Sequence, residues 1–209
     1  MPQHPTLKIS EIFPSVQGEG LRQGEATIFV RLSGCNLRCD FCDTKYAWTE
    51  GEEMRISVIL DKLDRIRESF PADWVCLTGG EPMLQNIDPL VRSLKERALA
   101  VQVETNGTQF RDLPIDWHTV SPKPPDYFFR TEYIPLAQEV KLVVTPDLSL
   151  ETIADLRRKF LETTPLILQP QSGFSGGGAK SYNLLKRSLR LGLKNIRIGL
   201  QMHVVLGLK

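Results

Sequence analysis

The sequence predicts an α/β fold in which mostly parallel strands form an incomplete, TIM-like βα barrel. Seven short runs rich in β-branched and other apolar residues recur along the chain, and four stretches with helical apolar spacing lie among them. This alternation is typical of βα units joined by right-handed crossovers. Because fewer than eight of each element are present and residues 107–139 show no clear helix, the predicted barrel does not close.

The predicted strands are near-continuous apolar runs, as in a sheet covered on both faces. They cover residues 26–32, 74–80, 100–107, 117–122, 139–144, 165–171 and 195–201. Each predicted helix presents one apolar face. The helices cover residues 56–70, 87–94, 150–160 and roughly 180–191, the last preceded by a flexible glycine turn at 176–178. A chain of 209 residues is long enough for one sizeable core, so we expect a single domain over residues 1–209.

Composition argues against nucleic-acid-binding, membrane-spanning and secreted proteins. The net charge is +1 and acidic and basic residues mix along the chain, which argues against a nucleic-acid partner. No apolar run approaches the ~20 residues that a membrane span needs, and the first ten residues lack the apolar segment of a secretory signal. We therefore expect a cytoplasmic protein with reduced thiols, whose four cysteines are metal ligands or core residues.

Small, polar and glycine-rich motifs follow the predicted strands. In βα barrels the active site gathers at the carboxyl ends of the strands. Here those ends carry "SGCNLRC", "TGGEP", "ETNGT", "SPKP" and "QPQS". The sequence therefore predicts one site at this edge of the sheet, and the cysteines belong to it.

Three cysteines, Cys35, Cys39 and Cys42, form a C-x3-C-x2-C motif. Structural zinc needs four ligands, and four-iron clusters usually take four thiolates as well. With three thiolates a cluster keeps one iron open to a small molecule. Cys76 lies inside an apolar run, where we expect a buried core residue; recruitment of Cys76 as a fourth zinc ligand is the alternative.

The cysteine motif follows one predicted strand, and "TGGEP" follows the next predicted strand. Together they resemble the signature of the radical S-adenosylmethionine superfamily. The resemblance implies a partial barrel of the radical S-adenosylmethionine type and a [4Fe-4S] cluster whose open iron binds S-adenosylmethionine. One electron from the cluster then cleaves this cofactor to a 5'-deoxyadenosyl radical. Glycines in "TGGEP" would let the backbone approach the methionyl amine.

Within the superfamily, the chain resembles the 7-carboxy-7-deazaguanine synthases from "EIFPSVQGEG" near the start to "LQMHVVLG" near the end. The resemblance implies conversion of 6-carboxy-5,6,7,8-tetrahydropterin to 7-carboxy-7-deazaguanine with loss of ammonia and regeneration of S-adenosylmethionine, a step in queuosine and 7-deazapurine biosynthesis. It also implies Mg²⁺, an external electron donor such as flavodoxin, and a homodimer.

The same resemblance assigns site residues. The residues expected to bind S-adenosylmethionine are Phe41, Cys42, Asp43, Gly80, Glu81, Ser121, Pro122, Lys123, Gln169, Pro170, Gln171 and Ser172. Those expected to bind the substrate are Val16, Gln17, Gly18, Arg31 and Thr78, and Thr44 is expected to bind Mg²⁺. Arg31 offers a two-pronged match for a carboxylate, and Mg²⁺ prefers oxygen ligands. Further polar candidates are Glu19 for the substrate and Glu104 and Asn106 for the ribose.

Several alternatives stay open. Arg31 could instead pair with a surface acid, Thr44 could cap a helix, and Glu81 could be a solvated loop acid. The rival functions are an activase that installs a glycyl radical on a partner protein and an iron–sulfur electron carrier with four protein ligands. Family members commonly end in "QTHK" and a short tail closing on proline, whereas this chain has Val204 at the lysine position and Lys209 last, so no substrate role is assigned there.

Overall fold

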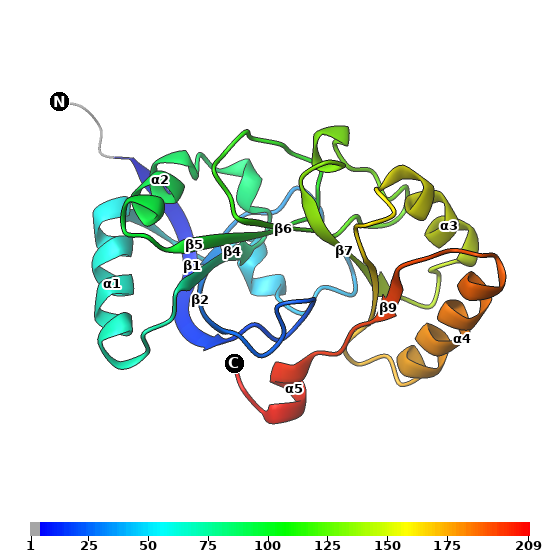
Figure 1. Ribbon diagram of the computed structural model, residues 1–209. Helices are drawn as coiled ribbons and strands as arrows, with labels where there is room; N and C mark the ends of the chain where they lie inside the picture. The colour runs from blue at the N-terminus through cyan, green and yellow to red at the C-terminus, as the bar shows by residue number, and fades with distance from the viewer. Residues whose placement is uncertain (1–4) are drawn as a thin grey trace.

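The computed structural model describes residues 5–209, in which nine strands form one open sheet (Figure 1). The strands are β1 (Thr6–Val16), β2 (Ala26–Leu32), β3 (Glu52–Arg55), β4 (Trp74–Gly79), β5 (Ala100–Thr105), β6 (Trp117–Val120), β7 (Ala137–Val144), β8 (Leu166–Pro170) and β9 (Ile196–Ile198). Their order is β3-β1-β2-β4-β5-β6-β7-β8-β9. Neighbours from β2 to β9 are parallel, and β1 runs antiparallel to β2 and β3.

Helices follow most of the parallel strands. They are α1 (Ile56–Ser69), α2 (Asp88–Glu96), α3 (Leu150–Lys159), α4 (Gly177–Arg190) and α5 (Met202–Leu206), with 3₁₀ turns at Lys45–Trp48, Pro82–Leu84 and Thr131–Tyr133. All seven predicted strands and four predicted helices are confirmed, as is the lack of a long helix between 107 and 139. The expected turn at 176–178 is wrong in part, because α4 already begins at Gly177.

Strands β1 and β3 and helix α5 were not predicted. β1 lacks a strong strand signal because it mixes charged residues with Pro14. β3 pairs only with residues 6–9 of β1, so Pro14 has an unpaired edge on one side, where proline is tolerated. These two strands extend the parallel sheet at one end and bring Glu11 and Phe13 beside β2.

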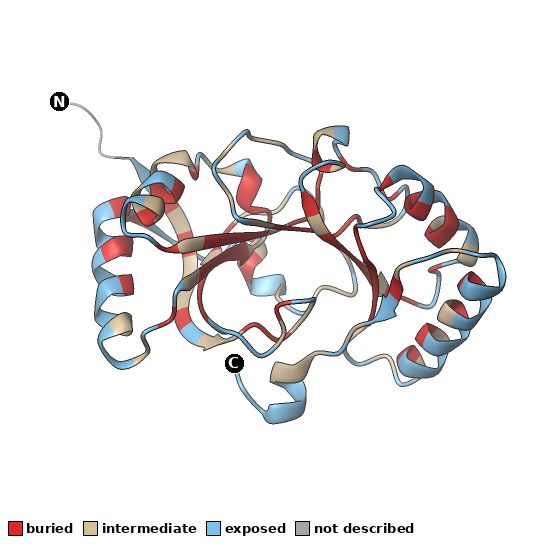
Figure 2. Ribbon diagram, viewed as in Figure 1, coloured by how far each residue is buried: buried red, intermediate tan, exposed pale blue. Residues whose placement is uncertain are grey.

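The two faces of the sheet differ in chemistry. Two apolar clusters fill the convex side, one under α1 and α2 and one under α3 and α4. Figure 2 shows buried residues along the strands and on the inward sides of these helices, with exposed residues outside. The concave side buries polar residues, including Gln102, Thr119 and Glu139. The strands are therefore buried on both faces, as expected, but the concave face mixes polar residues with a small apolar cluster of Phe13, Phe29 and Cys76, so the runs are less continuously apolar than expected.

Within residues 5–209, no helix has both the length and the apolar character that crossing a membrane requires.

Candidate functional site

A cavity of about 430 Å³ opens on the concave side, at the carboxyl ends of the parallel strands. The loop that follows β2 contributes Cys35, Cys39 and Cys42 to its lining. The loops after β4, β5, β6 and β8 supply further walls, so all five predicted motifs border one space. The expected site at this edge of the sheet is therefore present as a real cavity.

The three cysteines of the loop are partly exposed to this cavity. Leu37 N–H donates to Cys35 Sγ over 3.4 Å, a contact of the kind that tunes iron–sulfur ligands. Burial raises the pKa of Cys35 and of Cys39. In the part of the chain that the structure describes, no group of three or more His, Cys, Asp or Glu side chains is arranged to hold a metal ion; binding of a cluster would draw the three thiols together. Three thiols on one loop fit a three-ligand cluster.

Cys76 lies apart from this loop. It is 0% exposed and packs with Phe13 and Phe29 in a small apolar cluster, and it is not part of the cavity lining. Burial raises its pKa well above the usual value. The structure thus agrees with a core role for Cys76 and provides no fourth thiolate at the cavity.

The "TGGEP" segment packs directly against the cysteine loop. A Cβ atom on Gly80 would lie 1.9 Å from the carbonyl oxygen of Gly34, so only glycine fits there. Glu81 is 0% exposed and accepts hydrogen bonds from Met83 N–H, Thr105 Oγ1 and Asn106 N–H at 3.0, 2.7 and 2.6 Å. Glu81 is therefore not a solvated acid; it joins the ends of β4 and β5, and burial raises its pKa.

Arg31 reaches the cavity beside a carboxylate. Its Nε donates to Glu11 Oε1 over 2.7 Å, and Tyr46 Oη donates to the same oxygen over 2.6 Å. Both members of the ion pair are 17% exposed and line the cavity, so the partner of Arg31 is a site residue rather than a surface acid. Because the bond uses Nε, both terminal nitrogens of the guanidinium can serve a second carboxylate.

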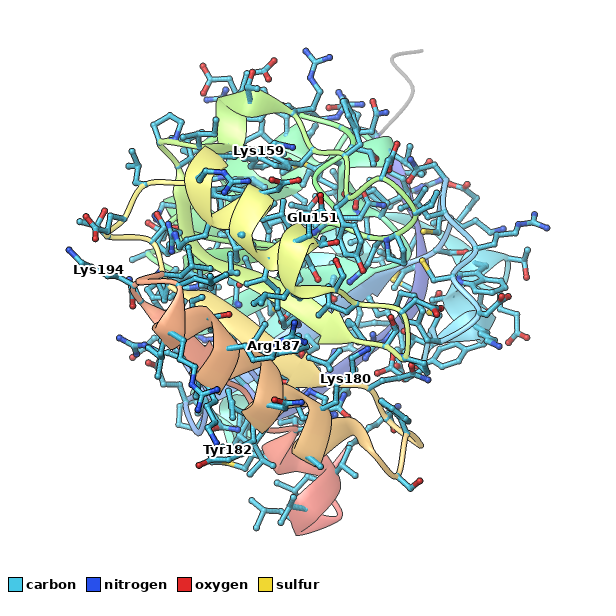
Figure 3. All side chains as sticks on the ribbon, turned by 90° about the vertical axis from the view of Figure 1, so that its right-hand side faces the viewer. Glu151, Lys159, Lys180, Tyr182, Arg187 and Lys194 are labelled. Atoms are coloured by element: carbon cyan, nitrogen blue, oxygen red, sulfur yellow. The ribbon has the colours of Figure 1, made fainter. Side chains whose placement is uncertain are left out.

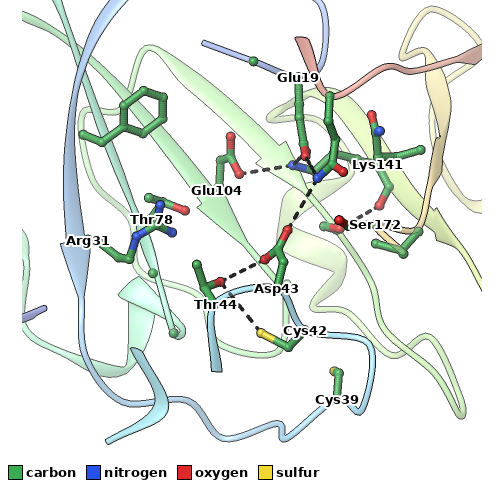
Figure 4. A pocket seen from close by; sticks show the side chains of 18 of the residues that line it. Glu19, Arg31, Cys39, Cys42, Asp43, Thr44, Thr78, Glu104, Lys141 and Ser172 are labelled. Carbon is green, nitrogen blue, oxygen red and sulfur yellow. Dashed lines mark hydrogen bonds and ion pairs between the residues drawn. The ribbon is translucent and has the colours of Figure 1, made fainter. Parts of the chain in front are cut away.

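A buried ion cluster forms the floor of the cavity (Figure 4). Lys141 Nζ contacts Glu19 Oε2 and lies 3.1 Å from Glu104 Oε2. Burial opposes the charge on Lys141, but Glu104 and Glu19 raise its pKa well above the usual value. Gln17 Nε2 donates to the other oxygen of Glu104 over 3.1 Å. Lys141 of β7 thereby fixes both Glu19, in the loop after β1, and Glu104 of β5.

Thr44 lies next to the last cysteine. It occupies the N-cap position of the first 3₁₀ turn but makes no capping hydrogen bond. Its Oγ1 donates to Asp43 Oδ1 over 3.0 Å and lies 3.8 Å from Cys42 Sγ. Both Thr44 and Asp43 line the cavity, so an oxygen pair faces the space beside the thiols.

The C-terminal segment closes one side of the cavity. Met202 N–H donates to Gly18 O over 2.8 Å, and Gln201 Nε2 donates to Glu19 Oε1 over 2.8 Å. A Cβ atom on Gly18 would lie 1.9 Å from His203 Nδ1, so this glycine makes room for the segment. Lys209 Nζ pairs with Glu11. The C-terminal segment, to which the sequence assigns no substrate role, thus forms part of the cavity wall.

Most predicted site residues border this cavity. They are Val16, Gln17, Gly18, Arg31, Cys35, Cys39, Phe41, Cys42, Asp43, Thr44, Thr78, Gly80, Ser121, Lys123, Gln169, Pro170, Gln171 and Ser172, together with the further candidates Glu19, Glu104 and Asn106. Glu81 and Pro122 are not among the lining residues. Sequence reasoning missed Glu11, Tyr46, Lys141, Gln201 and His203, which line it as well.

Comparison with known proteins places the chain in a family. Residues 29–207 match the family model described as "Radical SAM superfamily". The chain is 32% identical to 7-carboxy-7-deazaguanine synthase of Synechocystis sp. over 96% of this chain and 93% of that protein. It is 47% identical to the Rhodospirillum rubrum enzyme of the same name over a shorter stretch, 52% of this chain and 46% of that protein.

The solved structure titled "Crystal structure of QueE from Escherichia coli" matches with a TM-score of 0.78 and 27% identity over 95% of both chains. The fold, the cavity at the carboxyl ends of its strands and these near full-length relatives agree. The chain belongs to the radical S-adenosylmethionine superfamily and, within it, to the 7-carboxy-7-deazaguanine synthases.

Proposed function

We propose that this protein converts 6-carboxy-5,6,7,8-tetrahydropterin to 7-carboxy-7-deazaguanine with loss of ammonia, as its family membership implies. The observation that carries the proposal is a cavity at the carboxyl ends of the strands that both the three-cysteine loop and Arg31 line. Cys35, Cys39 and Cys42 hold the [4Fe-4S] cluster. When bound, the cluster and S-adenosylmethionine supply a 5'-deoxyadenosyl radical.

Polar groups around the cavity divide into two sets that suit two ligands. On the S-adenosylmethionine side, Lys123 Nζ donates to Ser121 Oγ over 2.6 Å, and Gln169 to Ser172 complete the wall. Glu104 is an acceptor for the ribose hydroxyls. Glu81 acts indirectly, because it holds the backbone around Asn106. These placements keep the ribose close to the thiol loop.

On the substrate side, Arg31 binds the carboxylate of the pterin acid through its terminal nitrogens. Thr78 at the end of β4 and the 16–18 segment line the same cavity. Glu19, held by Lys141 and Gln201, presents a carboxylate that matches the amino and ring N–H donors of a pterin. This arrangement fixes the ring in one orientation relative to the cofactor.

Magnesium fits beside the thiol loop. Thr44 Oγ1 offers one protein oxygen, and Mg²⁺ takes its other ligands from water and from substrate oxygens. We therefore expect weak Mg²⁺ binding in the absence of substrate. We also propose one domain over residues 1–209, a cytoplasmic location, an external one-electron donor and a homodimer.

An anaerobic assay tests the function. The protein is reconstituted with iron and sulfide, reduced, and given S-adenosylmethionine, Mg²⁺ and 6-carboxytetrahydropterin; mass spectrometry then looks for 7-carboxy-7-deazaguanine. We expect product only when S-adenosylmethionine is present, and none from Cys39→Ala, which loses the cluster. Formation of 5'-deoxyadenosine without a deazapurine would favour the activase instead. A cluster retained by Cys39→Ala with normal iron content would refute the three-thiolate assignment.

A further inference from the structure

Charge is distributed unevenly along this chain. All 25 acidic residues lie before residue 163, whereas the last 47 residues contain seven basic ones. Those seven are Lys180, Lys186, Arg187, Arg190, Lys194, Arg197 and Lys209. The expectation that acids and bases mix along the whole chain is therefore wrong for its final quarter. This part of the molecule presents positive charge to any partner.

The same segment exposes many large apolar side chains. Nine of the sixteen exposed large hydrophobic residues in the described chain belong to its last 28 residues. They are Tyr182, Leu189, Leu191, Ile198, Leu200, Val204, Val205, Leu206 and Leu208, at 41–68% exposure. Exposed apolar residues gathered in this way mark interaction surfaces in proteins.

One stripe of α4 combines both properties. Tyr182, Lys186, Leu189 and Arg190 are exposed and share one side of the helix by their spacing. The buried side of α4 is opposite and contains Gly177, Ser181, Leu184 and Ser188. Apolar and basic side chains therefore alternate on a helix surface that no other element of the described chain needs for its own packing.

Further exposed basic and apolar residues lie on the sheet edge beside α4 and on α5. β9 is the last strand of the sheet, packs beside α4, and exposes Arg197 and Ile198. In Figure 3, α5 lies lower than α4, and Figure 1 shows that α5 also lies nearer the middle of the molecule, with β9 between the two helices. We define the α4–α5 face as this stripe of α4 together with Arg197, Ile198, Leu200, Val205 and Leu206.

The α5 end of this face lies close to the thiol loop. Gln201, at the start of α5, places Nε2 3.4 Å from Oδ2 of Asp43, the residue after Cys42. Val204 lines the cavity that holds the three cysteines and is also 57% exposed. The α5 end of the α4–α5 face therefore borders the cavity in which the cluster would bind.

We propose that the α4–α5 face docks the acidic one-electron carrier protein, a flavodoxin or a ferredoxin, that reduces the cluster. The proposal rests on the proposed function, which needs a reduced cluster. One electron passes from the reduced carrier to the oxidised cluster; the carrier is oxidised by one electron and no bond forms or breaks. Basic residues steer the acidic carrier to the face, and the apolar residues between them supply buried contact area.

A second copy of the chain fits this face less well. A two-fold contact would bring this basic surface, with Lys186, Arg190 and Arg197, against the same basic surface of the other copy. No acidic residue in the final 47 residues is available to offset that repulsion. Charge complementarity thus favours an acidic partner, and it predicts binding that weakens as salt rises.

The test uses the double charge reversal Lys186→Glu/Arg190→Glu in the reconstituted protein. Its matched control is Lys62→Glu/Arg65→Glu on α1, which packs at the opposite edge of the sheet. Binding of a fluorescently labelled acidic flavodoxin is followed by anisotropy, and turnover is measured with flavodoxin and separately with dithionite. We expect Lys186→Glu/Arg190→Glu, the α4 variant, to weaken flavodoxin binding at least about tenfold. The flavodoxin concentration that gives half-maximal turnover should rise by the same factor.

Turnover with dithionite should stay the same in both variants, and the control should bind flavodoxin within about twofold of the parent protein. Unchanged binding by the α4 variant would overturn the proposal. The proposal would also be overturned if sedimentation showed that the parent protein is a dimer and that this variant dissociates it while its affinity for flavodoxin stays the same. Failure of the parent protein to form the deazapurine with dithionite would refute the proposed function instead, and the binding measurement would still decide the docking face.

Discussion

Along β7, Val140 and Leu142 belong to the apolar core under α3 and α4, whereas Glu139 and Lys141 belong to the concave side. The same alternation appears in β6, where His118 packs against Tyr133 and Thr119 donates to Glu139. Each strand therefore contributes one face to the fold and one to the site.

This difference suggests how the molecule tolerates change. Losing a side chain on the convex face leaves a cavity in an apolar core, which lowers stability but does not alter the site. Losing one on the concave face leaves buried charges without partners and alters ligand binding as well. Four substitutions test this difference between the two faces.

Lys141→Met should have the largest effect on the concave face. It leaves Glu19 and Glu104 buried without a cation, which costs about 3–5 kcal/mol in free energy of unfolding. Denaturant unfolding at neutral pH measures this, together with the affinity for S-adenosylmethionine. The control is Lys95→Met, whose ion pair with Asp116 is about one-third exposed and should change stability by less than about 1 kcal/mol. Equal stability of both variants would contradict the role of Lys141.

Leu142→Ala, one residue along, should destabilise the fold by about 2–5 kcal/mol because it empties a fully buried core position. Unlike Lys141→Met, it should leave the KM for the pterin acid unchanged at temperatures where the variant is folded. Thermal unfolding and steady-state kinetics together separate the two effects. A changed KM in a stably folded variant would show that the faces are not independent.

Arg31→Ala should act mainly on substrate binding. Loss of a charge-assisted contact costs about 1.5–3 kcal/mol, which corresponds to a roughly ten- to hundredfold weaker affinity for the pterin acid. Isothermal titration with the substrate gives this value, and Arg92→Ala, an exposed arginine on α2, serves as control. An unchanged substrate affinity combined with failed cofactor cleavage would mean that Arg31 serves another step.

His118 should give the smallest effect and one that depends on pH. Burial lowers its pKa from 6.5 to about 4, so the neutral ring stabilises the fold above the unfolded-state pKa. That stabilisation is lost as the pH falls from 6.5 towards 4, by about 1 kcal/mol at pH 5.5. Denaturant unfolding across this pH range should show that the free energy of unfolding depends less steeply on pH in His118→Gln than in the parent protein. Identical slopes would exclude His118 as the source of acid sensitivity.

Sequence reasoning found the parts of the site that lie at strand ends. The cysteines and "TGGEP" stand out because glycine or thiol chemistry interrupts an apolar pattern, and their common edge follows from a parallel sheet. Lys141 and Glu11 lie inside strands, where a charged residue looks like ordinary solvent-facing alternation. Only the pairing of β7 with its neighbours, and of β1 with β2, brings them into the cavity.

The C-terminal wall could not be predicted for a different reason. Its position depends on long-range contacts, such as Met202 N–H to Gly18 O and Gln23 Nε2 to Leu200 O. These contacts depend on the shape of a distant loop and leave no periodic signal in the sequence. Because this chain also departs from the usual family ending, the family resemblance did not predict a role for the segment.

The measurement that tests the central claim most directly is electron paramagnetic resonance of the reduced, reconstituted protein, recorded with and without S-adenosylmethionine. If Cys35, Cys39 and Cys42 are the only protein ligands, the cofactor reaches the open iron and changes the spectrum of the cluster. A spectrum that stays the same when S-adenosylmethionine binds would mean that a fourth protein ligand closes the cluster, which would contradict the account.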